Sequence, residues 1–449
     1  MSSLHNTQQK MKNQKEETMI RSSKQFLAPY ANTNKINNLE IVLAEYRRLV
    51  NHYINYLWNN KVSFSTKSGK QIEFDIQNNN FDIPSKIHYK YIPDDSGTWL
   101  SARLKGNAIN DASKLIRSVT AKKAKQLYMY NKLKSEGTPK NKLNHLIKKI
   151  KYIPKQPSAD KLKMVIDSKF FDLQETPKGK FYGFLRISSI GNNMFIKIPV
   201  VSNRTFKKYK NNKLTAIGIS DNRVDLCWEI PKPAIKNSGN EIGVDQGMKD
   251  VVTCSNGYTP NKKCIHGHSL ESIMRKMSNK KKGSKAFKRV QEHRTNFINW
   301  SINQLNLNNV KEVKFEEVVN IGFKQGKSRL MSHWTNTIIR DKLKSYCEEE
   351  GVRFTLVPSV YRSQRCNSCG IVRKSNRKGK EYKCKHCGYT ADADLNASMN
   401  LLIDLPEIPY SLRKLQMNRG NGFYWKPDGI YEFETGRSYE SLPLKNEDN

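Results

Sequence analysis

The sequence lacks two features that mark membrane and secreted proteins. It contains no uninterrupted apolar run long enough to cross a bilayer, and no signal peptide is recognisable. We therefore expect a cytoplasmic protein, nucleoid-associated in a prokaryotic cell, that has no membrane partner.

Acidic residues are also scarce. The 449 residues include 79 Lys and Arg against 41 Asp and Glu, so the formal net charge is +38. A field of this sign suits a polyanion, and nucleic acid is the default partner. An anionic membrane surface is disfavoured, because the charge is spread over the whole chain rather than confined to one amphipathic helix. The alternative of a basic protein that binds anions without specificity remains open. The polar stretch up to Lys24 is predicted to be disordered.

Cysteine is limited to eight residues, which fits a reducing compartment. Four of them are scattered and are interpreted as ordinary residues: Cys227, Cys254, Cys264 and Cys347. The other four form two Cys-x-x-Cys pairs, each followed by glycine: Cys366, Cys369, Cys384 and Cys387. Two such pairs predict one tetrahedral structural zinc site in a zinc ribbon. Two disulfides, or free thiols, are the alternative.

The first half of the chain changes character near residue 163. Apolar residues at helical spacing predict helices over Asn38–Trp58, Gly97–Tyr130 and Lys142–Tyr152. Their basic residues predict a surface that follows phosphates, with the candidates Arg117, Lys122 and Lys123. Short alternating runs then continue to Ile230, with a hairpin turn at Gly191-Asn192-Asn193, and predict a β-barrel or small sandwich.

The second half alternates strands and helices. It begins with a strand and a hairpin from Glu241, and a basic helical stretch over Leu270–Leu307 follows. A strand over Val310–Glu317, a helix from about His333 and a further strand then lead into the ribbon. This order predicts an RNase H-like domain in which the ribbon is an insertion. The basic stretch supplies three further nucleic-acid candidates: Lys281, Lys282 and Lys285. The segment from Pro406 is not assigned.

Three acids occupy the positions that a metal-dependent nuclease requires. Strand alternation places Asp245 opposite the apolar residues of its strand, and it places Glu316 opposite Val313 and Phe315. Asp394 begins the last helix. Together they predict a site for two Mg²⁺ or Mn²⁺ ions that hydrolyses a phosphodiester.

Neighbouring acids leave alternatives at two of these positions. Glu317 lies beside Glu316 but would point with Phe315. Asp392 could cap the last helix as easily as bind metal. Any one of the three predicted ligands, taken alone, could equally be a surface or capping acid.

These motifs resemble those of TnpB nucleases of insertion sequences and of miniature type V CRISPR effectors. The resemblance covers Glu241 to Leu402 and rests on GVDQG, FEEV, SQRCNSCG and CKHCGYTADADLNASMN. It implies a RuvC-like nuclease with Asp245, Glu316 and Asp394 as its acidic triad, and the four paired cysteines as zinc ligands of a target-nucleic-acid-binding insertion. The second motif usually has one acid followed by Asp, whereas Glu316 and Glu317 are adjacent here.

The resemblance also implies a multidomain α+β organisation. The predicted regions are a disordered segment (1–24), a helical recognition lobe (25–162), a β-barrel wedge domain (163–236), a RuvC-like nuclease in two parts (237–360 and 392–405), an inserted zinc ribbon (361–391) and a tail (406–449).

The implied function is RNA-guided cleavage of DNA. The partners are a guide RNA and a double-stranded DNA target with a short adjacent motif. An unguided nuclease and an RNA-guided repressor are the alternatives. The large basic helical half argues against the first, and the complete triad argues against the second.

Overall fold

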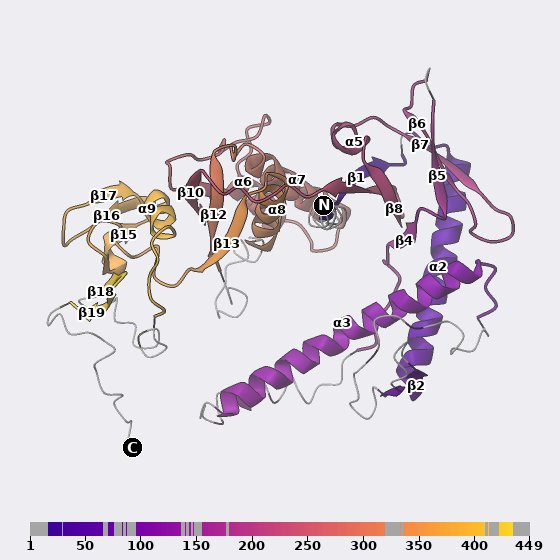
Figure 1. The fold of residues 1–449 in the computed structure, drawn as a ribbon, viewed down its shortest axis with the longest axis horizontal. Helices are drawn as coiled ribbons and strands as arrows, with labels where there is room; N and C mark the ends of the chain where they lie inside the picture. Colours follow the sequence, from indigo (N-terminus) through magenta and orange to yellow (C-terminus); the bar gives the residue numbers. More distant parts are fainter. Residues whose placement is uncertain are drawn as a thin grey trace, which may run out of the picture. The chain divides into compact units, whose positions relative to one another are not determined.

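The computed structural model describes residues 17–28, 30–65, 71–75, 96–135, 155–176, 179–318, 336–408 and 422–433, with single positions between these ranges. The chain divides into two compact units, Met1–Pro231 and Lys232–Asn449. Both units combine helices with sheets, in line with the predicted multidomain α+β fold (Figure 1).

Two long helices dominate the first unit. α2 spans Thr33–Asn59 and begins at Asn32, whose side chain accepts a hydrogen bond from the backbone N–H of Lys35. α3 spans Ala102–Ser135. Both match predicted helices, and a third prediction, Lys142–Tyr152, lies almost entirely outside the described residues.

The strands of this unit form three sheets. A four-stranded sheet has the order β1-β9-β8-β4, a three-stranded sheet has the order β5-β6-β7, and β2 pairs with β3. Their bounds are Thr18–Phe26 (β1), Val62–Ser65 (β2), Gln71–Phe74 (β3), Met164–Asp167 (β4), Phe171–Glu175 (β5), Gly183–Ile187 (β6), Ile196–Val200 (β7), Lys213–Ser220 (β8) and Arg223–Pro231 (β9), with a short helix α5 at Arg204–Tyr209. One hydrophobic core joins α2 and α3 to these strands.

The hairpin turn predicted between β6 and β7 is present. Asn192 and Asn193 have φ angles of 48° and 53°, in the left-handed region that Asn tolerates better than most residues. The preceding Gly191 has a φ of 146°.

The predicted disorder up to Lys24 is wrong for residues 18–24, which belong to β1. This strand pairs antiparallel with β9 along its whole length. Its polar residues have buried partners: Ser23 accepts a hydrogen bond of 2.9 Å from the indole N–H of Trp228, and Gln25 bonds the backbone of Val201. A polar composition therefore concealed a strand whose polar groups are satisfied inside the protein.

The second unit is built on a four-stranded sheet of order β11-β10-β12-β13. β10 runs antiparallel to β11 and parallel to β12, which runs parallel to β13. The bounds of these elements are Asn240–Gln246 (β10), Val252–Cys254 (β11), Leu270–Ser278 (α6), Lys285–Ile302 (α7), Val310–Glu317 (β12), Asn336–Glu349 (α8), Arg353–Pro358 (β13) and Ala393–Asn400 (α9). The predicted order of strands and helices is present.

The basic helical stretch predicted from Leu270 to Leu307 consists of two helices. α6 ends at Ser278 and α7 begins after Ser284, whose hydroxyl accepts a hydrogen bond from the backbone N–H of Phe287. Gly283 between them has a φ of 87°, which a continuous helix cannot contain.

The ribbon contains four short strands and takes two more from the unassigned tail. β14 (Ile371–Val372), β15 (Arg377–Lys378), β16 (Glu381–Lys383) and β17 (Thr390–Asp392) lie within it. The tail contributes β18 (Phe423–Lys426) and β19 (Gly429–Glu432), which complete the sheet β14-β18-β19. The described part of the tail is therefore a structural part of the ribbon.

None of the described helices is both long enough and apolar enough to cross a bilayer.

Candidate metal centre and active site

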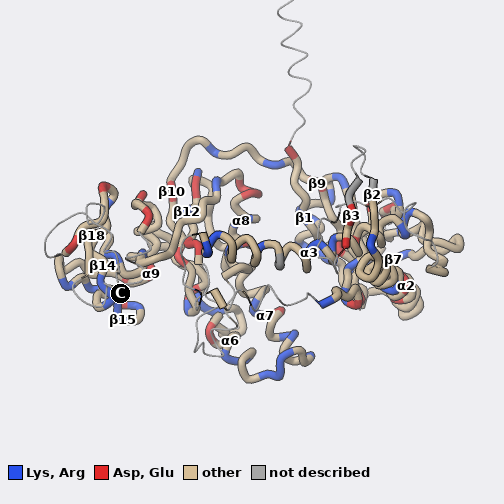
Figure 2. The backbone as a smooth tube through the Cα atoms, turned by 90° about the horizontal axis from the view of Figure 1, so that it is seen from below, with Lys and Arg blue, Asp and Glu red and all other residues tan. Residues whose placement is uncertain are grey.

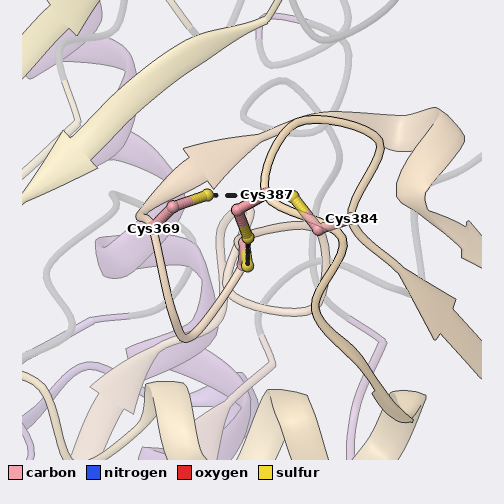
Figure 3. A group of neighbouring side chains, drawn as sticks. Cys369, Cys384 and Cys387 are labelled. Carbon is pink, nitrogen blue, oxygen red and sulfur yellow. Dashed lines mark hydrogen bonds between the residues drawn. The ribbon is translucent and has the colours of Figure 1, made fainter.

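The four paired cysteines form one cluster. Their sulfur atoms all lie within 4.8 Å of one another, and Figure 3 shows three of the side chains converging between two loops. The distance from Cys366 Sγ to Cys387 Sγ is 3.7 Å, and that from Cys369 Sγ to Cys384 Sγ is also 3.7 Å. Zinc–sulfur bonds of about 2.3 Å in a tetrahedron place sulfurs about 3.8 Å apart. The cluster therefore has the dimensions of a four-thiolate site for one metal ion.

The disulfide alternative does not hold for this cluster. A disulfide needs sulfurs about 2.05 Å apart, and all four cysteines are free. The close contacts also join one cysteine of each pair to one of the other. Burial raises the pKa of the Cys366 thiol to about 11. Burial would also raise the pKa of Cys387, but hydrogen bonds from the backbone N–H of Tyr389 and from the other thiols lower it to about 7.

Two asparagines of α9 bind the ribbon to this helix. The Asn396 side chain accepts from the backbone N–H of Asn367 at 3.1 Å and donates to the carbonyl of Arg365 at 2.9 Å. Asn400 accepts from the guanidinium of Arg365 at 2.6 Å and donates to the carbonyl of Arg362 at 3.1 Å. Both asparagines are fully buried. Their spacing of four residues places them on one helix face, which explains these positions of the motif Asp-Leu-Asn-Ala-Ser-Met-Asn.

Helix α9 reaches the sheet because β10 has a glycine at the contact. A Cβ atom on Gly243 would lie 2.0 Å from the carbonyl oxygen of Ser398 in α9. Alternation along β10 turns Asp245 to the same face as Gly243, toward this helix. The first turn of α9 contains Asp394. Close backbone approach at Gly243 thus brings Asp394 to the end of β10.

Asp245 and Glu316 lie on neighbouring parallel strands. The register pairs Val244 with Phe315, so Asp245 and Glu316 are the next residues along. Their carboxyl groups share a hydrogen bond. Asp245 is buried and Glu316 is half-buried. The structure places Glu316, rather than Glu317, beside Asp245, in agreement with strand alternation.

Burial and mutual repulsion raise the pKa values of this pair. The pKa of Asp245 lies well above its usual range, first because the carboxyl group is buried. The negative charges of Glu316 and Asp394 also disfavour its ionised form. Burial raises the pKa of Glu316 to about 7, and Asp394 contributes in the same direction. Three carboxyl groups that repel one another in a protein site are a donor set suited to a hard divalent cation.

Asp392 has the capping role that the sequence left open. Its Oδ1 accepts hydrogen bonds of 2.9 and 3.1 Å from the backbone N–H groups of Asp394 and Leu395. The side chain of Asp392 is thereby committed to the start of α9.

Two cations from the ribbon lie against Asp394. Arg377 donates to Asp394 Oδ1 at 2.7 Å, and the Lys380 ammonium contacts Asp394 Oδ2. Lys380 also bonds Asp250 Oδ2 at 2.6 Å. Burial alone would lower the pKa of Lys380, but the hydrogen bonds to both carboxylates raise it. The ribbon therefore supplies the positive charge of the carboxylate cluster.

A family model matches part of the second unit. Residues 337–401 match the family model described as "Cas12f1-like, TNB domain". The chain carries a Cas12f1-like TNB domain. This stretch holds α8, β13, the cysteine cluster and α9 with Asp394.

Three curated relatives add to this match. A CRISPR-associated endodeoxyribonuclease Cas12f1 of Sulfoacidibacillus thermotolerans is 25% identical over 202 residues, which are 38% of this chain and 47% of the relative. A TnpB-like protein of Aquifex aeolicus is 30% identical over 95 residues, or 20% and 31% of the two chains. A putative RNA-guided DNA endonuclease InsQ of Escherichia coli is 42% identical over 53 residues, or 12% and 13%. The chain thus matches about half the length of the first relative and less of the other two. The predicted resemblance to TnpB and compact type V proteins is confirmed.

The sequence did not single out Arg377, Lys380 or Asp250. Arg377 and Lys380 lie in the basic loop of the TNB domain, and nothing in their spacing shows that they turn toward Asp394 rather than solvent. The sequence offers one signal for this contact: Lys380 lies between the two cysteine pairs, a short distance before the helix that contains Asp394.

The six residues predicted to bind nucleic acid are separate in sequence from the three carboxylates. The structure describes the side chains of four of them. Lys281, Lys282 and Lys285 are exposed at the turn between α6 and α7, where Figure 2 shows basic residues gathered. Arg117 is exposed on α3. Lys122 and Lys123 lie in α3, but their side chains are outside the described residues.

Proposed function

We propose that this protein is an RNA-guided DNA endonuclease with one RuvC-like active site. The observation that carries the proposal is the convergence of Asp245, Glu316 and Asp394 from β10, β12 and α9. The pKa values of the first two are raised, chiefly by burial. The matches to a Cas12f1 nuclease and to a putative RNA-guided endonuclease support the same reaction class.

In this proposal Asp245, Glu316 and Asp394 hold two Mg²⁺ or Mn²⁺ ions. When bound, the ions activate water and stabilise the leaving oxygen of the phosphodiester. Asp245 and Glu316 would be held as carboxylates in the metal-bound site, because a nearby cation would offset the burial and the repulsion by Asp394 that raise their pKa values. Arg377 is placed to offset negative charge beside Asp394.

The four cysteines are assigned to one structural zinc ion. Zinc accepts four thiolates in a closed tetrahedron, and the two sulfur–sulfur distances of 3.7 Å fit that geometry. In this assignment zinc fixes both knuckles of the ribbon, and the ribbon in turn holds Arg377 and Lys380 against Asp394. The zinc site thus supports the active site without taking part in the reaction.

Guide RNA and target DNA are assigned as partners. The net charge of +38 needs a polyanion, and exposed basic residues lie on α3 and at the turn between α6 and α7. Base pairing would read the target sequence, and the protein would read a short adjacent motif. The boundaries of the recognition lobe, wedge domain and two-part nuclease are part of the same proposal.

The deciding experiment combines cleavage with RNA sequencing. We expect the purified protein to contain RNA, and we expect it to cut only DNA that matches the guide portion of that RNA, in the presence of Mg²⁺. Equal cutting of matched and unmatched duplexes would favour an unguided nuclease. Guide-dependent binding with no cutting in Mg²⁺ or Mn²⁺ would favour a repressor.

A further inference from the structure

Lys380 stands between two buried carboxylates in the turn that joins β15 to β16. Its Nζ lies 2.6 Å from Asp250 Oδ2 and also contacts Asp394 Oδ2. Asp250 and Asp394 are 6% and 7% exposed, and they come from different parts of the nuclease domain. One ammonium group therefore neutralises a pair of acids, only one of which belongs to the proposed triad.

Lys380 contacts the oxygen of Asp394 that lies nearer Gly247, the residue that follows β10. Asp394 Oδ2 lies 3.8 Å from the position a Cβ atom on Gly247 would take, just beyond β10. Its other oxygen, Oδ1, is held by Arg377. Oδ2 is thus the oxygen nearer the end of β10, where Asp245 lies, and Lys380 covers it.

We propose that Lys380 is a built-in competitor of the catalytic metal ions, which takes the place of a cation at Asp394 and withdraws to Asp250 when metal binds. The inference rests on the proposed two-metal site and adds a residue that regulates its loading. Metal binding would thereby be coupled to the ribbon, since Lys380 belongs to the ribbon and Asp394 to α9. By linkage, metal binding would weaken the contact between Lys380 and Asp394 by the same factor by which that contact weakens metal binding.

The chemistry of lysine suits two positions. An ammonium group carries three donors on a flexible stem, so it can exchange one carboxylate partner for another, whereas a guanidinium fork is committed to one geometry. Asp250 offers the alternative position, because it bonds Lys380 at 2.6 Å while Lys262 lies farther away, at 3.8 Å. Asp250 keeps the ammonium paired after it leaves Asp394.

Mn²⁺ binding tests the proposal without a cleavage assay. Titration of the full-length, zinc-loaded protein with Mn²⁺, followed by electron paramagnetic resonance, measures a dissociation constant. We expect Lys380→Met to lower this constant about tenfold, because the competing charge is gone. We expect Asp250→Asn to raise it about threefold, because Lys380 has lost its other partner. The double variant should match Lys380→Met, since Asp250 matters only when the lysine is present.

The control is Lys378→Met, which removes an exposed charge from the neighbouring strand β15. It should change Mn²⁺ binding less than twofold. If Lys380 merely positions Asp394, Lys380→Met will weaken Mn²⁺ binding, which overturns the proposal. If Asp250→Asn weakens binding equally with and without Lys380, Asp250 acts directly on the metal and the exchange is wrong. If wild-type protein binds Mn²⁺ no more tightly than Asp394→Ala does, the proposed active site is wrong as well.

Discussion

The cysteine cluster and the carboxylate cluster are both tied to α9, but they reach their arrangement in different ways. Neutral thiols can converge without a counter-charge, and two local turns bring all four sulfurs within 4.8 Å. The carboxylates come from β10, β12 and α9, and like charges oppose their approach. Two of them have raised pKa values, and the third is paired with Arg377 and Lys380. A site of thiols can be assembled by local sequence, whereas a site of acids needs cations from elsewhere in the fold.

The largest expected effect comes from removing a carboxylate. Asp245→Ala, Glu316→Ala or Asp394→Ala should each reduce DNA cleavage by more than about a thousandfold, since the remaining acids cannot hold both ions. Target binding should survive, because affinity comes from base pairing and phosphate contacts. Cleavage and gel-shift assays at one salt concentration separate the two.

Glu317→Ala is the matched control for the carboxylate series. It should keep most of the activity, because the structure places Glu316 rather than Glu317 beside Asp245. An inactive Glu317→Ala with an active Glu316→Ala would show that the strand register is off by one. Full activity of all four variants in Mg²⁺ would end the nuclease assignment.

Breaking the cysteine cluster should have the next largest effect. Cys384→Ser should reduce the zinc content from about one ion per chain to a small fraction, because three thiolates no longer close the tetrahedron. The ribbon should then become sensitive to protease, and cleavage should fall because the ribbon no longer holds Arg377 beside Asp394. Elemental analysis gives the zinc content directly.

Cys347→Ser is the control for a buried cysteine outside the cluster. It should retain full zinc content, since Cys347 lies in the hydrophobic core of the second unit, away from the cluster. Wild-type protein without zinc would refute the assignment of the cluster.

Asn396→Leu should lower the stability of the protein without releasing zinc, so it tests the contact between α9 and the ribbon independently of the cysteine cluster. It removes the side-chain bonds to the backbone of Asn367 and Arg365. The half-buried N–H of Asn367 loses its partner, whereas the carbonyl of Arg365 keeps a hydrogen bond of 2.8 Å from Asn400. We expect a loss of about 1–3 kcal/mol in the free energy of unfolding, from one unsatisfied group. Zinc content should stay near one ion per chain, because no cysteine has changed. Urea unfolding and elemental analysis test the two parts, and an unchanged stability would contradict the role of this asparagine.

The smallest expected effect is the pH dependence of Glu316. Its pKa of about 7 in the folded protein lies above the ordinary value of 4.5, so the folded state binds this proton more tightly than the unfolded chain does. The free energy of unfolding should therefore fall as the pH rises from 4.5 to 7. Without added divalent metal, Glu316→Gln should be more stable than wild type at pH 8, on the order of 1 kcal/mol after allowance for partial exposure.

The advantage of Glu316→Gln should shrink as the pH approaches 4.5, and Mg²⁺ should reduce it at pH 8. Glu317→Gln serves as the control, since it changes an acid of the same strand. A stability difference that does not vary with pH would show that the proton is not held as the structure indicates. Denaturant unfolding at several pH values gives the comparison.

Much of this protein follows from its sequence alone. The spacing of the cysteine pairs is local, so it predicted the cluster that the structure contains. Strand alternation distinguished Glu316 from Glu317, because successive side chains on a strand point to opposite faces. Helical periodicity identified α2 and α3, in which an apolar stripe faces the core.

Tertiary structure decided the remainder. β1 looked disordered because its polar residues are satisfied only by distant partners such as Trp228. The tail could not be assigned from the sequence, because β18 and β19 form a sheet together with β14, which lies much earlier in the chain. Arg377 and Lys380 looked like ordinary loop charges until the fold turned them toward Asp394. In the first two cases the deciding interaction joins residues far apart along the chain. In the third it depends on which way the turn between β15 and β16 directs its side chains, and no local pattern encodes that.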